Sequence, residues 1–489
     1  MDRRHNARRA MLLAAGMIAL GGCQQSPTIG KLLKDGGRDA GDGTSAGGWV
    51  ISAGGPGSDG KLGQIVVDGA GDLVVTGPFS GNATFGGRTL TATRATGRYV
   101  AKLRADDHEL VWVVPIQGDL QVEHTSGLAT DDAGNIYLSG SFSGSASFGD
   151  AGSGSITRVS KGETDIFVAK LAATGKPIWA VSAGGPGSGP LATDFANHAY
   201  RVAVDKGTGQ VVAAGAFRGT ISFGDTTLTA SGMTDIFVAR LDAGGRFLWA
   251  RRPDSDAPRE GALGLTIDPT GSSFVTGHII SWSTPVATFG DLTPQTGLGL
   301  FVTKMDAAGR FLWATLPPSS PTCGGHDIAL DSEGNTYAAL NVGAANGGSC
   351  VLGLAAKVDP GGKPLWLRTT GGSDPCRAGS MTHKLVVDSA GHATLCGAFS
   401  GSQQLGAKLF TAQGDQDMFL AGLDPQGKVV WARQAGGPGT DMATSLARDR
   451  EGNLYVAGSF EQTADFGGVR LTSQGESDLF IWKIPAAVQ

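Results

Sequence analysis

The stretches "DDAGNIYLSGSFSG" (131–144) and "DIFVAKL" (165–171) decide the fold, because their pattern returns along most of the chain. The pattern begins with an Asp that is followed, after two residues (three in one copy), by a Gly, and its copies lie roughly 60 residues apart. A β-branched or aromatic run comes next, and a second turn and a Trp follow further on. The repeated aspartates are Asp68, Asp131, Asp205, Asp268, Asp331, Asp388 and Asp449. Seven copies at a steady period indicate a repeat architecture.

Each copy predicts four short strands, which in the first copy are "QIVVD", "DLVVTGPF", "RYVAKL" and "LVWVV". The repeated Asp suits the turn between the first two strands, since its carboxylate can accept backbone N–H groups two or three residues on. The Gly after it supplies the positive φ that closes a hairpin. A calcium loop would need several carboxylates at alternate positions, and the pattern does not supply them. We therefore expect turn residues here, not calcium ligands.

Seven radially repeated four-stranded units predict an all-β fold, a seven-bladed β-propeller. The two ends of the repeat region complement each other, because "GGWVISAG" (47–54) precedes any first strand and the last copy stops after "DLFIWKI" (478–484). The Trp49 strand is expected to complete the last blade and close the ring, which removes an exposed edge. The recurring Trp is expected to be an apolar anchor between neighbouring sheets.

The units resemble the bacterial β-propeller repeat family called SBBP, on "DDAGNIYLSGSFSG" (131–144), "DIFVAKL" (165–171) and "DREGNLYVAGSF" (449–460). The resemblance covers about residues 47–485 and implies an extracytoplasmic repeat protein, in a family with no single assigned activity. The fifth copy departs most from the pattern, with Leu340 in place of a Gly and the insertion "GAANGGSC".

The N-terminus predicts export. Four arginines within residues 1–9 precede the apolar run "AMLLAAGMIAL", which is typical of a secretory signal and too short to span a bilayer. Leu20–Cys23 resembles the bacterial lipobox, which implies lipidation of Cys23; an ordinary signal peptide with a chance cysteine is the alternative. The predicted domains are a signal peptide (1–22), a lipidated Cys with a Gly-rich tether (23–46), and the propeller (47–489), with repeats beginning near 61, 124, 198, 261, 326, 383 and 442.

Four cysteines remain, Cys323, Cys350, Cys376 and Cys396, and an even number in an exported protein suggests disulfides. Three pairings are possible. Proximity in sequence favours Cys323 with Cys350 and Cys376 with Cys396. No CxxC spacing occurs, so a zinc site built from cysteines alone is not expected.

Composition and motifs exclude several function classes. The formal charge of −5 and the lack of a basic stripe give no reason to expect nucleic-acid binding. No Gly-x-Ser-x-Gly or His-Glu-x-x-His motif occurs. "LAATGKPIW" (171–179) resembles the Trp-docking motif of pyrroloquinoline-quinone propellers, but the paired cysteines of those enzymes are missing and a turn explains the motif. No cofactor or metal is therefore expected.

The candidate ligand-binding face lies at the mouth of the channel. His124 and His198 stand seven residues before their turn Asp, and His326 and His383 stand five before, so all four are expected near the starts of innermost strands. The stretch "SAGGPGSDG" (52–60), with copies at 182–189 and 434–441, is expected to connect the rim of one blade to the axis of the next. It is not a phosphate loop, because no helix follows it. These loops add Asp59 and Asp441 to the face.

Three interpretations of that face stay open: solvated polar residues, imidazoles that bind a metal or transfer protons, and a carboxylate pair for glycoside hydrolysis. The favoured function is a non-enzymatic lipoprotein, held at the cell envelope by its N-terminal lipid, that binds or scaffolds protein or glycan. One alternative is an envelope hydrolase or lyase acting on polysaccharide at the channel mouth. Another is an outer-membrane assembly factor, whose eight-bladed relatives need one more blade than this chain supplies.

Overall fold

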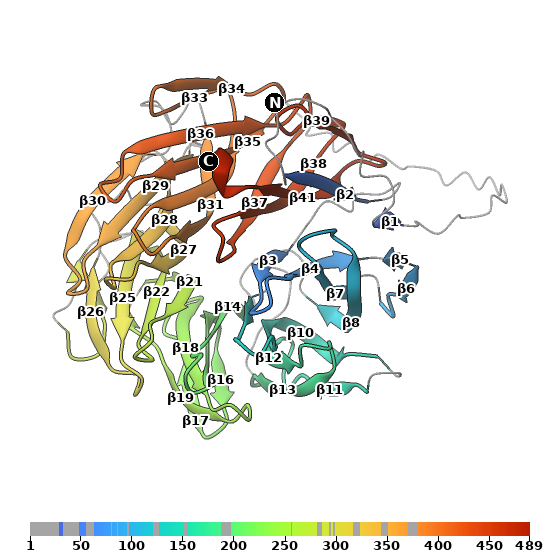
Figure 1. The fold of residues 1–489 in the computed structure, drawn as a ribbon. Helices are drawn as coiled ribbons and strands as arrows, with labels where there is room; N and C mark the ends of the chain where they lie inside the picture. Colours follow the sequence, from blue (N-terminus) through green and yellow to red (C-terminus); the bar gives the residue numbers. More distant parts are fainter. Residues whose placement is uncertain are drawn as a thin grey trace, which may run out of the picture.

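In the residues that it describes, the computed structural model contains β-strands and one short 3-10 turn, so the all-β class is confirmed. It describes residues 29–32, 48–54, 63–79, 81–85, 87–94, 97–120, 127–150, 154–186, 197–255, 257–280, 286–292, 295–296, 299–315, 323–343, 351–369 and 379–489. The sheets stand side by side around a centre, and the first strand of each set lies toward that centre (Figure 1).

Five of the sheets are antiparallel and four-stranded, with hydrogen bonding in the order first, second, third and fourth strand. Four of them are continuous in sequence: β14 (His198–Val204), β15 (Val211–Phe217), β18 (Asp235–Leu241) and β19 (Phe247–Arg251); β21 (Arg259–Ile267), β22 (Ser273–Ile280), β25 (Gly299–Met305) and β26 (Phe311–Thr315); β27 (Cys323–Leu330), β28 (Thr336–Gly343), β29 (Val351–Val358) and β30 (Pro364–Thr369); β31 (Ser380–Val387), β32 (Ala393–Phe399), β35 (Asp417–Leu423) and β36 (Val429–Ala435).

The fifth four-stranded sheet joins the two ends of the repeat region. It consists of β37 (Met442–Arg448), β38 (Leu454–Phe460), β41 (Asp478–Ile484) and the N-terminal β2 (Trp49–Ala53). Strand β2 pairs antiparallel with β41, with Trp49 opposite Lys483. The N-terminal strand therefore provides the outer strand that the last copy lacks, as the sequence predicts.

The first two copies share one nine-stranded sheet, where the sequence predicts two separate sheets. Its strands are β3 (Gln64–Val67), β4 (Leu73–Phe79), β7 (Gly97–Leu103), β8 (Leu110–Leu120), β9 (Leu128–Thr130), β10 (Ile136–Phe148), β11 (Ile156–Val159), β12 (Asp165–Leu171) and β13 (Pro177–Ala183). The two sets are joined because the end of β8 pairs with the end of β10, for example Ile116 with Phe148. The equivalent contacts further along are single β-bridges at Gly184 and Gly436. Those loops carry Pro186 and Pro438, and proline has no N–H with which to extend a ladder.

Short hairpins and strands cover the outside of several sheets. They are β5 (Asn82–Phe85) with β6 (Arg88–Thr91), β16 (Thr220–Phe223) with β17 (Thr226–Thr229), β20 (Asp254–Ser255) with β23 (Val286–Thr288) and β24 (Gln295–Thr296), β33 (Ser402–Leu405) with β34 (Lys408–Thr411), and β39 (Thr463–Asp465) with β40 (Arg470–Thr472). Strand β1 (Ile29–Leu32) falls within the predicted tether, yet it pairs in parallel with β5. The free edge of a two-stranded hairpin offers backbone groups to a further strand, which explains this departure from a tether throughout.

The repeated aspartates form the predicted turns. Asp205 Oδ1 accepts the N–H groups of Gly207 and Thr208 at 3.0 and 3.2 Å. In all seven copies the Oδ1 atom accepts a backbone N–H two to four residues on. The carboxylate thereby provides the hydrogen-bond acceptor that closes the hairpin.

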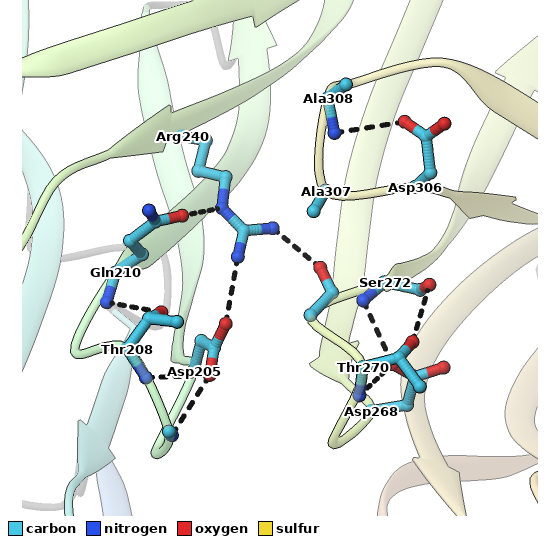
Figure 2. Close-up of polar contacts among 12 residues, drawn as sticks. Asp205, Thr208, Gln210, Arg240, Asp268, Thr270, Ser272, Asp306, Ala307 and Ala308 are labelled. Atoms are coloured by element: carbon cyan, nitrogen blue, oxygen red, sulfur yellow. Dashed lines mark hydrogen bonds and ion pairs between the residues drawn. The ribbon is translucent and has the colours of Figure 1, made fainter.

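A basic residue of the third strand adds a contact that the sequence analysis missed. Arg240 Nη2 donates to Asp205 Oδ2 at 3.0 Å, and the same guanidinium donates to Gln210 and, at 2.6 Å, to the Gly271 carbonyl of the next sheet (Figure 2). Lysines hold the equivalent place in four other copies: Lys102 with Asp68, Lys170 with Asp131, Lys304 with Asp268 and Lys357 with Asp331. The turn is thus tied to the third strand and, through Arg240, to the neighbouring sheet.

The recurring Trp joins one sheet to the next. Trp179 Nε1 donates to the Ala243 carbonyl and Trp249 Nε1 to the Ala307 carbonyl, both at 3.0 Å and both in the second turn of the following copy. The glycine of that turn lies beneath the indole, since a Cβ on Gly309 (φ 82°) would lie 2.9 Å from Trp249 Cδ2. The same contacts recur at Trp112 with Ala173, Trp313 with Pro360 and Trp366 with Pro425, and Trp49 donates to Ala105 at 3.3 Å. The anchoring role is confirmed, with a hydrogen bond in addition to the expected apolar contact.

The contact between Trp249 and Gly309 predicts the effect of adding a methyl group at Gly309. Gly309→Ala should destabilise the protein by about 1–3 kcal/mol more than Gly467→Ala, because only the first methyl collides with an indole. Gly467 is the matched control, with φ at 79° and nothing within 4 Å of its added Cβ, so it isolates the cost of positive φ. Thermal unfolding of both variants measures the difference, and equal losses would contradict the joint.

The ion pair in Figure 2 gives a second prediction. Arg240→Met leaves the buried Asp205 carboxylate without its cation and should cost about 3 kcal/mol. The control is Arg246→Met, whose side chain is 80% exposed beside Asp242, and it should cost less than about 1 kcal/mol. Urea unfolding separates the two variants, and similar losses would show that the Arg240 pair does not hold the turn.

Candidate axial site

The glycines of the "GGPG" loops are required by a buried carboxylate. Asp165, at the start of β12, accepts the N–H of Lys161 at 3.1 Å, and a Cβ on Gly184 would overlap its carboxylate. Gly54 meets Asp478 and Gly436 meets Asp417 in the same way. The loop therefore passes so close to the third strand that a side chain at its first glycine has no room.

Asp441 lies beneath such a loop. Its Oδ2 accepts the N–H of Gly437 at 2.6 Å and its Oδ1 that of Glu461 at 3.3 Å, and burial raises the pKa of this carboxyl to about 7. In the register of other sheets the same position holds Asn197, which bridges Thr164 and Arg218, and Glu260, whose pKa burial raises to about 8. The structure thus places Asp441 as a buried loop-holding group and not on the surface of a ligand-binding face.

A β-bulge occurs near the start of the inner strand in five sheets. One extra residue stands there between the regular pairs on either side, and the extra residues are Tyr200, Leu263, His326, His383 and Thr444. Such a bulge redirects a side chain. It also presses a carbonyl against the second strand, because a Cβ on Gly277 or Gly397 would overlap the oxygen of Gly261 or Met381. This close approach explains the Gly that ends the second-strand run. In the fifth copy, where Leu340 replaces it, Gly325 is the residue opposite.

The bulges bring two of the predicted histidines together with residues from neighbouring sheets. Arg201 Nη2, from β14, donates to the His326 carbonyl of β27 at 3.0 Å, although the sheet of β21 lies between them in sequence. Charges on His383, Arg201 and His278 act on His326, and burial is the largest cause that lowers the pKa of His326 to about 3.

His278 and His383 complete the imidazole group. Burial, with the charge of Arg259, lowers the pKa of His278 to about 4. Burial also lowers the pKa of His383, whose Nδ1 donates to the Ala443 carbonyl at 2.9 Å. The rings are therefore neutral near pH 7. We call Arg201, Arg259, His278, His326 and His383 the axial cluster.

Two glycines of the inner strands lie next to the rings of His278 and His326. A Cβ on Gly324 would lie 3.7 Å from His326 Nε2 and 3.9 Å from His278 Nδ1, and a Cβ on Gly261 would lie 2.9 Å from His278 Cε1. Both rings are only partly buried by their neighbours. A side chain at Gly261 would therefore displace the His278 imidazole, whereas a methyl group at Gly324 would lie in ordinary van der Waals contact with both rings.

His198 does not belong to the cluster. It stands two residues before the bulge residue Tyr200 and is 1% exposed. A hydrogen bond of 2.6 Å joins its Nδ1 to Ser141 Oγ of the preceding set of strands, and its ring packs on Tyr200 with centroids 4.5 Å apart. Its place is a contact between neighbouring strand sets.

Sequence reasoning missed Arg201, Arg259 and His278. Alignment of the copies at the bulge would have placed Arg201 directly after the position that His326 and His383 share. His278 stands in the second strand and Arg259 at the head of β21, outside the column of histidines that the spacing singled out. Charged residues in the alignment columns next to the histidine column were the sequence signal that could have identified them.

Several predicted residues lie outside the described part of the chain, namely Cys23, Asp59, His124, Cys350 and Cys376. Cys323 is described only by its backbone, at the start of β27. The pairing of Cys323 with Cys350 therefore stays a prediction.

The predicted disulfide between Cys376 and Cys396 is corrected by the structure, in which Cys396 is a free thiol. Its Sγ lies fully buried between β32 and the next sheet, 3.7 Å from the Ala443 carbonyl. Burial raises the pKa of this thiol far above its usual range. Proximity in sequence is a poor guide here, because side chains of a strand alternate between two faces.

Two features are absent from the described residues. No three His, Cys, Asp or Glu side chains within the described ranges are placed to hold a metal ion. In the same part of the chain, no helix has the length and apolar character needed to cross a membrane.

The fold is an all-β arrangement of repeated antiparallel sheets. More narrowly, the family model described as the SBBP β-propeller repeat matches residues 430–459, which confirms the resemblance seen in the sequence. The match spans most of β36, all of β37 and most of β38.

Similar solved structures include puromycin hydrolase, at 14% identity and a TM-score of 0.41, over 85% of this chain and 53% of that one. They also include an ulvan lyase of family PL25 bound to -[GlcA(1-4)Rha3S]- (10%, 0.42, 87% of this chain and 94% of that one). A third is a protein of unknown function from Dyadobacter fermentans (10%, 0.38, 88% and 96%). This chain spans about half the length of puromycin hydrolase, and none of these likenesses assigns an activity. No curated protein matches the sequence.

The lowered pKa values predict a loss of stability in mild acid. The unfolded chain takes up protons near pH 6.5, whereas His278 and His326 in the folded protein take them up only near pH 4 and 3. Stability should therefore fall as the pH decreases from 6.5 to 5, by at most about 2 kcal/mol for each histidine.

His326→Gln removes one of these groups and should flatten the profile over that interval. Urea unfolding at several pH values measures the slope. His392→Gln removes an imidazole that is exposed beside Asp388, and its profile serves as the comparison. Equal slopes for wild type and His326→Gln would show that His326 is protonated normally.

Proposed function

We propose that this β-propeller repeat protein is a non-enzymatic binding or scaffold module, held at the cell envelope by a lipid on Cys23, with seven blades in a closed ring. Five four-stranded sheets and the two four-strand sets of the nine-stranded sheet support the blade count. Pairing of β2 with β41, the bond from Trp49 to Ala105, and contact between β3 and β37 support closure.

The observation that carries the binding function is that buried ionisable side chains make structural contacts within and between the sheets. Asp441 holds a loop, Asp165 holds a turn, and Asp327 accepts the Lys384 ammonium at 2.9 Å and the Leu385 N–H at 3.1 Å across two sheets. These carboxylates are buried, so a substrate would have to displace the contacts that join the sheets. A rigid ring with its carboxylates occupied in this way suits presentation of a surface.

A hydrolase or lyase is the second candidate, because Glu260 and Asp441 have the raised pKa values that a general acid needs. The two carboxyls stand in β21 and next to β37, in sheets that do not pair, and Asp441 lies under its own loop. A glycosidase pair faces one substrate from two sides. Release of new reducing ends or unsaturated sugar from envelope polysaccharide, abolished by Asp441→Asn, would replace the binding proposal with this one.

An assembly factor of the outer membrane is the third candidate. Its relatives with eight blades need one more four-stranded set than the seven that we propose. The chain shares with them the anchor inferred from residues 20–23 and the repeat architecture. Capture of an outer-membrane assembly component by the envelope protein would favour this candidate.

The anchor predicts incorporation of a lipid. Labelled palmitate supplied to bacteria that express the full chain should enter the wild type, and Cys23→Ala should remove the label. Cys396→Ala, which deletes a buried thiol, should keep it. Fractionation should show the labelled protein with membranes, and equal labelling of wild type and Cys23→Ala would overturn the lipid anchor.

A further inference from the structure

We propose that a cavity between the sheet that ends in β30 and the sheet that ends in β36 is a binding site for an uncharged saccharide. This proposal deepens the proposed binding function and rests on it. The cavity has a volume of about 600 Å³, and small-molecule sites typically have volumes of ~300–1,000 Å³. None of its residues belongs to the axial cluster. We call it the turn cavity.

Three turns and one outer strand surround the turn cavity. Glu333 comes from the turn between β27 and β28, Ser389 from the turn between β31 and β32, and Gln426 from the turn between β35 and β36. Trp366 and Arg368 stand in β30. In an antiparallel sheet, the turn after the first strand and the turn after the third strand lie at the same end. The turn cavity therefore opens at the end of the sheets that carries the Asp turns.

A lysine in the third strand explains why this space is open. In the third copy, the guanidinium of Arg240 reaches across to the Gly271 carbonyl of the next sheet. The equivalent residue of the fifth copy is Lys357, whose Nζ lies 3.3 Å from Asp331 Oδ2 in its own sheet. Lysine lacks the forked end with which arginine bonds two partners at once. No cation therefore crosses from Lys357 to the next sheet in the way that Arg240 does.

The lining offers donors and acceptors of hydrogen bonds together. Within the described residues, Glu333 Oε1, the side-chain amide of Gln426 and the Ser389 hydroxyl make no hydrogen bond. The Lys357 side chain is only 9% exposed, and its ammonium keeps N–H donors beyond the contact with Asp331. A sugar hydroxyl donates and accepts at the same atom, so a polyhydroxylated ligand can use such a mixed lining fully.

The charges of the lining favour an uncharged ligand. Two carboxylates, Asp331 and Glu333, stand against two cations, Lys357 and Arg368, so the formal charges cancel. A lining of one sign would instead concentrate ions of the opposite sign. The turn cavity therefore gives an ionic ligand no net electrostatic advantage.

Apolar groups complete the wall. The Leu365 side chain is 50% exposed, and Pro425 also lines the cavity. Trp366 is fixed in place, because its Nε1 donates to the Pro425 carbonyl at 3.0 Å and its ring packs edge-on against Tyr337 with centroids 5.9 Å apart. Small-molecule sites combine an apolar wall with a few placed polar groups. The C–H groups of a sugar ring suit such a wall, while its hydroxyls suit the polar side chains.

The repeat does not require these polar side chains. Glu333, Arg368 and Gln426 meet at the junction of the fifth and sixth copies. At the junction of the second and third copies, the three equivalent places hold Ala133, Val181 and Gly244. The same turns and the same Trp contact form there with small or apolar residues, as Trp179 shows. The polar set at the turn cavity is therefore specific to one junction.

Titration of the purified full chain, followed by ligand NMR, tests the proposal. Maltose, cellobiose and N,N′-diacetylchitobiose are the uncharged probes, D-glucuronate is the anionic probe and glycylglycine is the zwitterionic probe. We expect at least one uncharged disaccharide to bind more tightly than both charged probes. The probe that binds best distinguishes a plain hexose from an N-acetylated sugar. Glu333→Ala should weaken this binding about tenfold, because it removes a charged hydrogen-bond acceptor.

Glu451→Ala is the matched control. Glu451 is exposed and holds the place of Glu333 in the seventh copy, but it does not line the turn cavity. This variant should bind like the wild type. Thermal unfolding checks the fold of each variant, and Gln426→Ala, at an exposed turn residue, replaces Glu333→Ala if that variant unfolds.

Three outcomes would overturn the turn cavity as a saccharide site. They are lack of binding by all three disaccharides, tighter binding of glycylglycine or D-glucuronate, and equal affinity of the wild type and the cavity variant. The same samples are assayed for new reducing ends. Cleavage of a disaccharide would contradict the proposed non-enzymatic function whether or not the turn cavity binds, so the two failures are distinguishable.

Discussion

The joint between the indole of one sheet and the second turn of the next is the contact on which the rest of the structure depends. It combines an N–H bond to a turn carbonyl with a ring packed on a glycine, as at Trp249 with Ala307 and Gly309. Because six of the tryptophans make this bond to a second turn, the same contact sets the spacing of the sheets that they join. Trp49 makes it with Ala105 from the opposite end of the chain, so the N-terminal strand is held by the interaction that holds the others.

Polar groups are buried at several places in this arrangement because loops and strands pack closely over them. The loops after the Trp strands β2, β13 and β36 run over the carboxylates of Asp478, Asp165 and Asp417. In five sheets the inner strand also carries a bulge whose carbonyl presses on the second strand. Glycines at 184 and 277 permit both approaches. Contacts inside the fold therefore explain the glycine-rich stretches that look like phosphate loops. The other residues of these loops determine what the loops expose to solvent.

Much of the fold could be predicted from the sequence, because the elements repeat and each repeat has local causes. The Asp column, the strand lengths and the pairing of the Trp49 strand with the last copy follow from turn chemistry and alternation. The ladder between β8 and β10 could not be predicted. It depends on the backbone geometry of the segment after the Trp112 strand, which lacks the proline that the loops after Trp179 and Trp431 carry. The free state of Cys396 could not be predicted either, because proximity in sequence does not reveal which face of a strand a side chain occupies.

The candidate site could be predicted only in part, because its residues do not share one position of the repeat. His326 and His383 were found because they share a column, whereas Arg201, Arg259 and His278 stand in other columns and meet them only in space. A contact required by the fold recurs in every copy, as the turn Asp and the Trp do. The axial cluster does not recur, since other copies place Leu263 and Thr444 at the bulge. Residues that break the repeat in this way are therefore not determined by the local rules that all copies share.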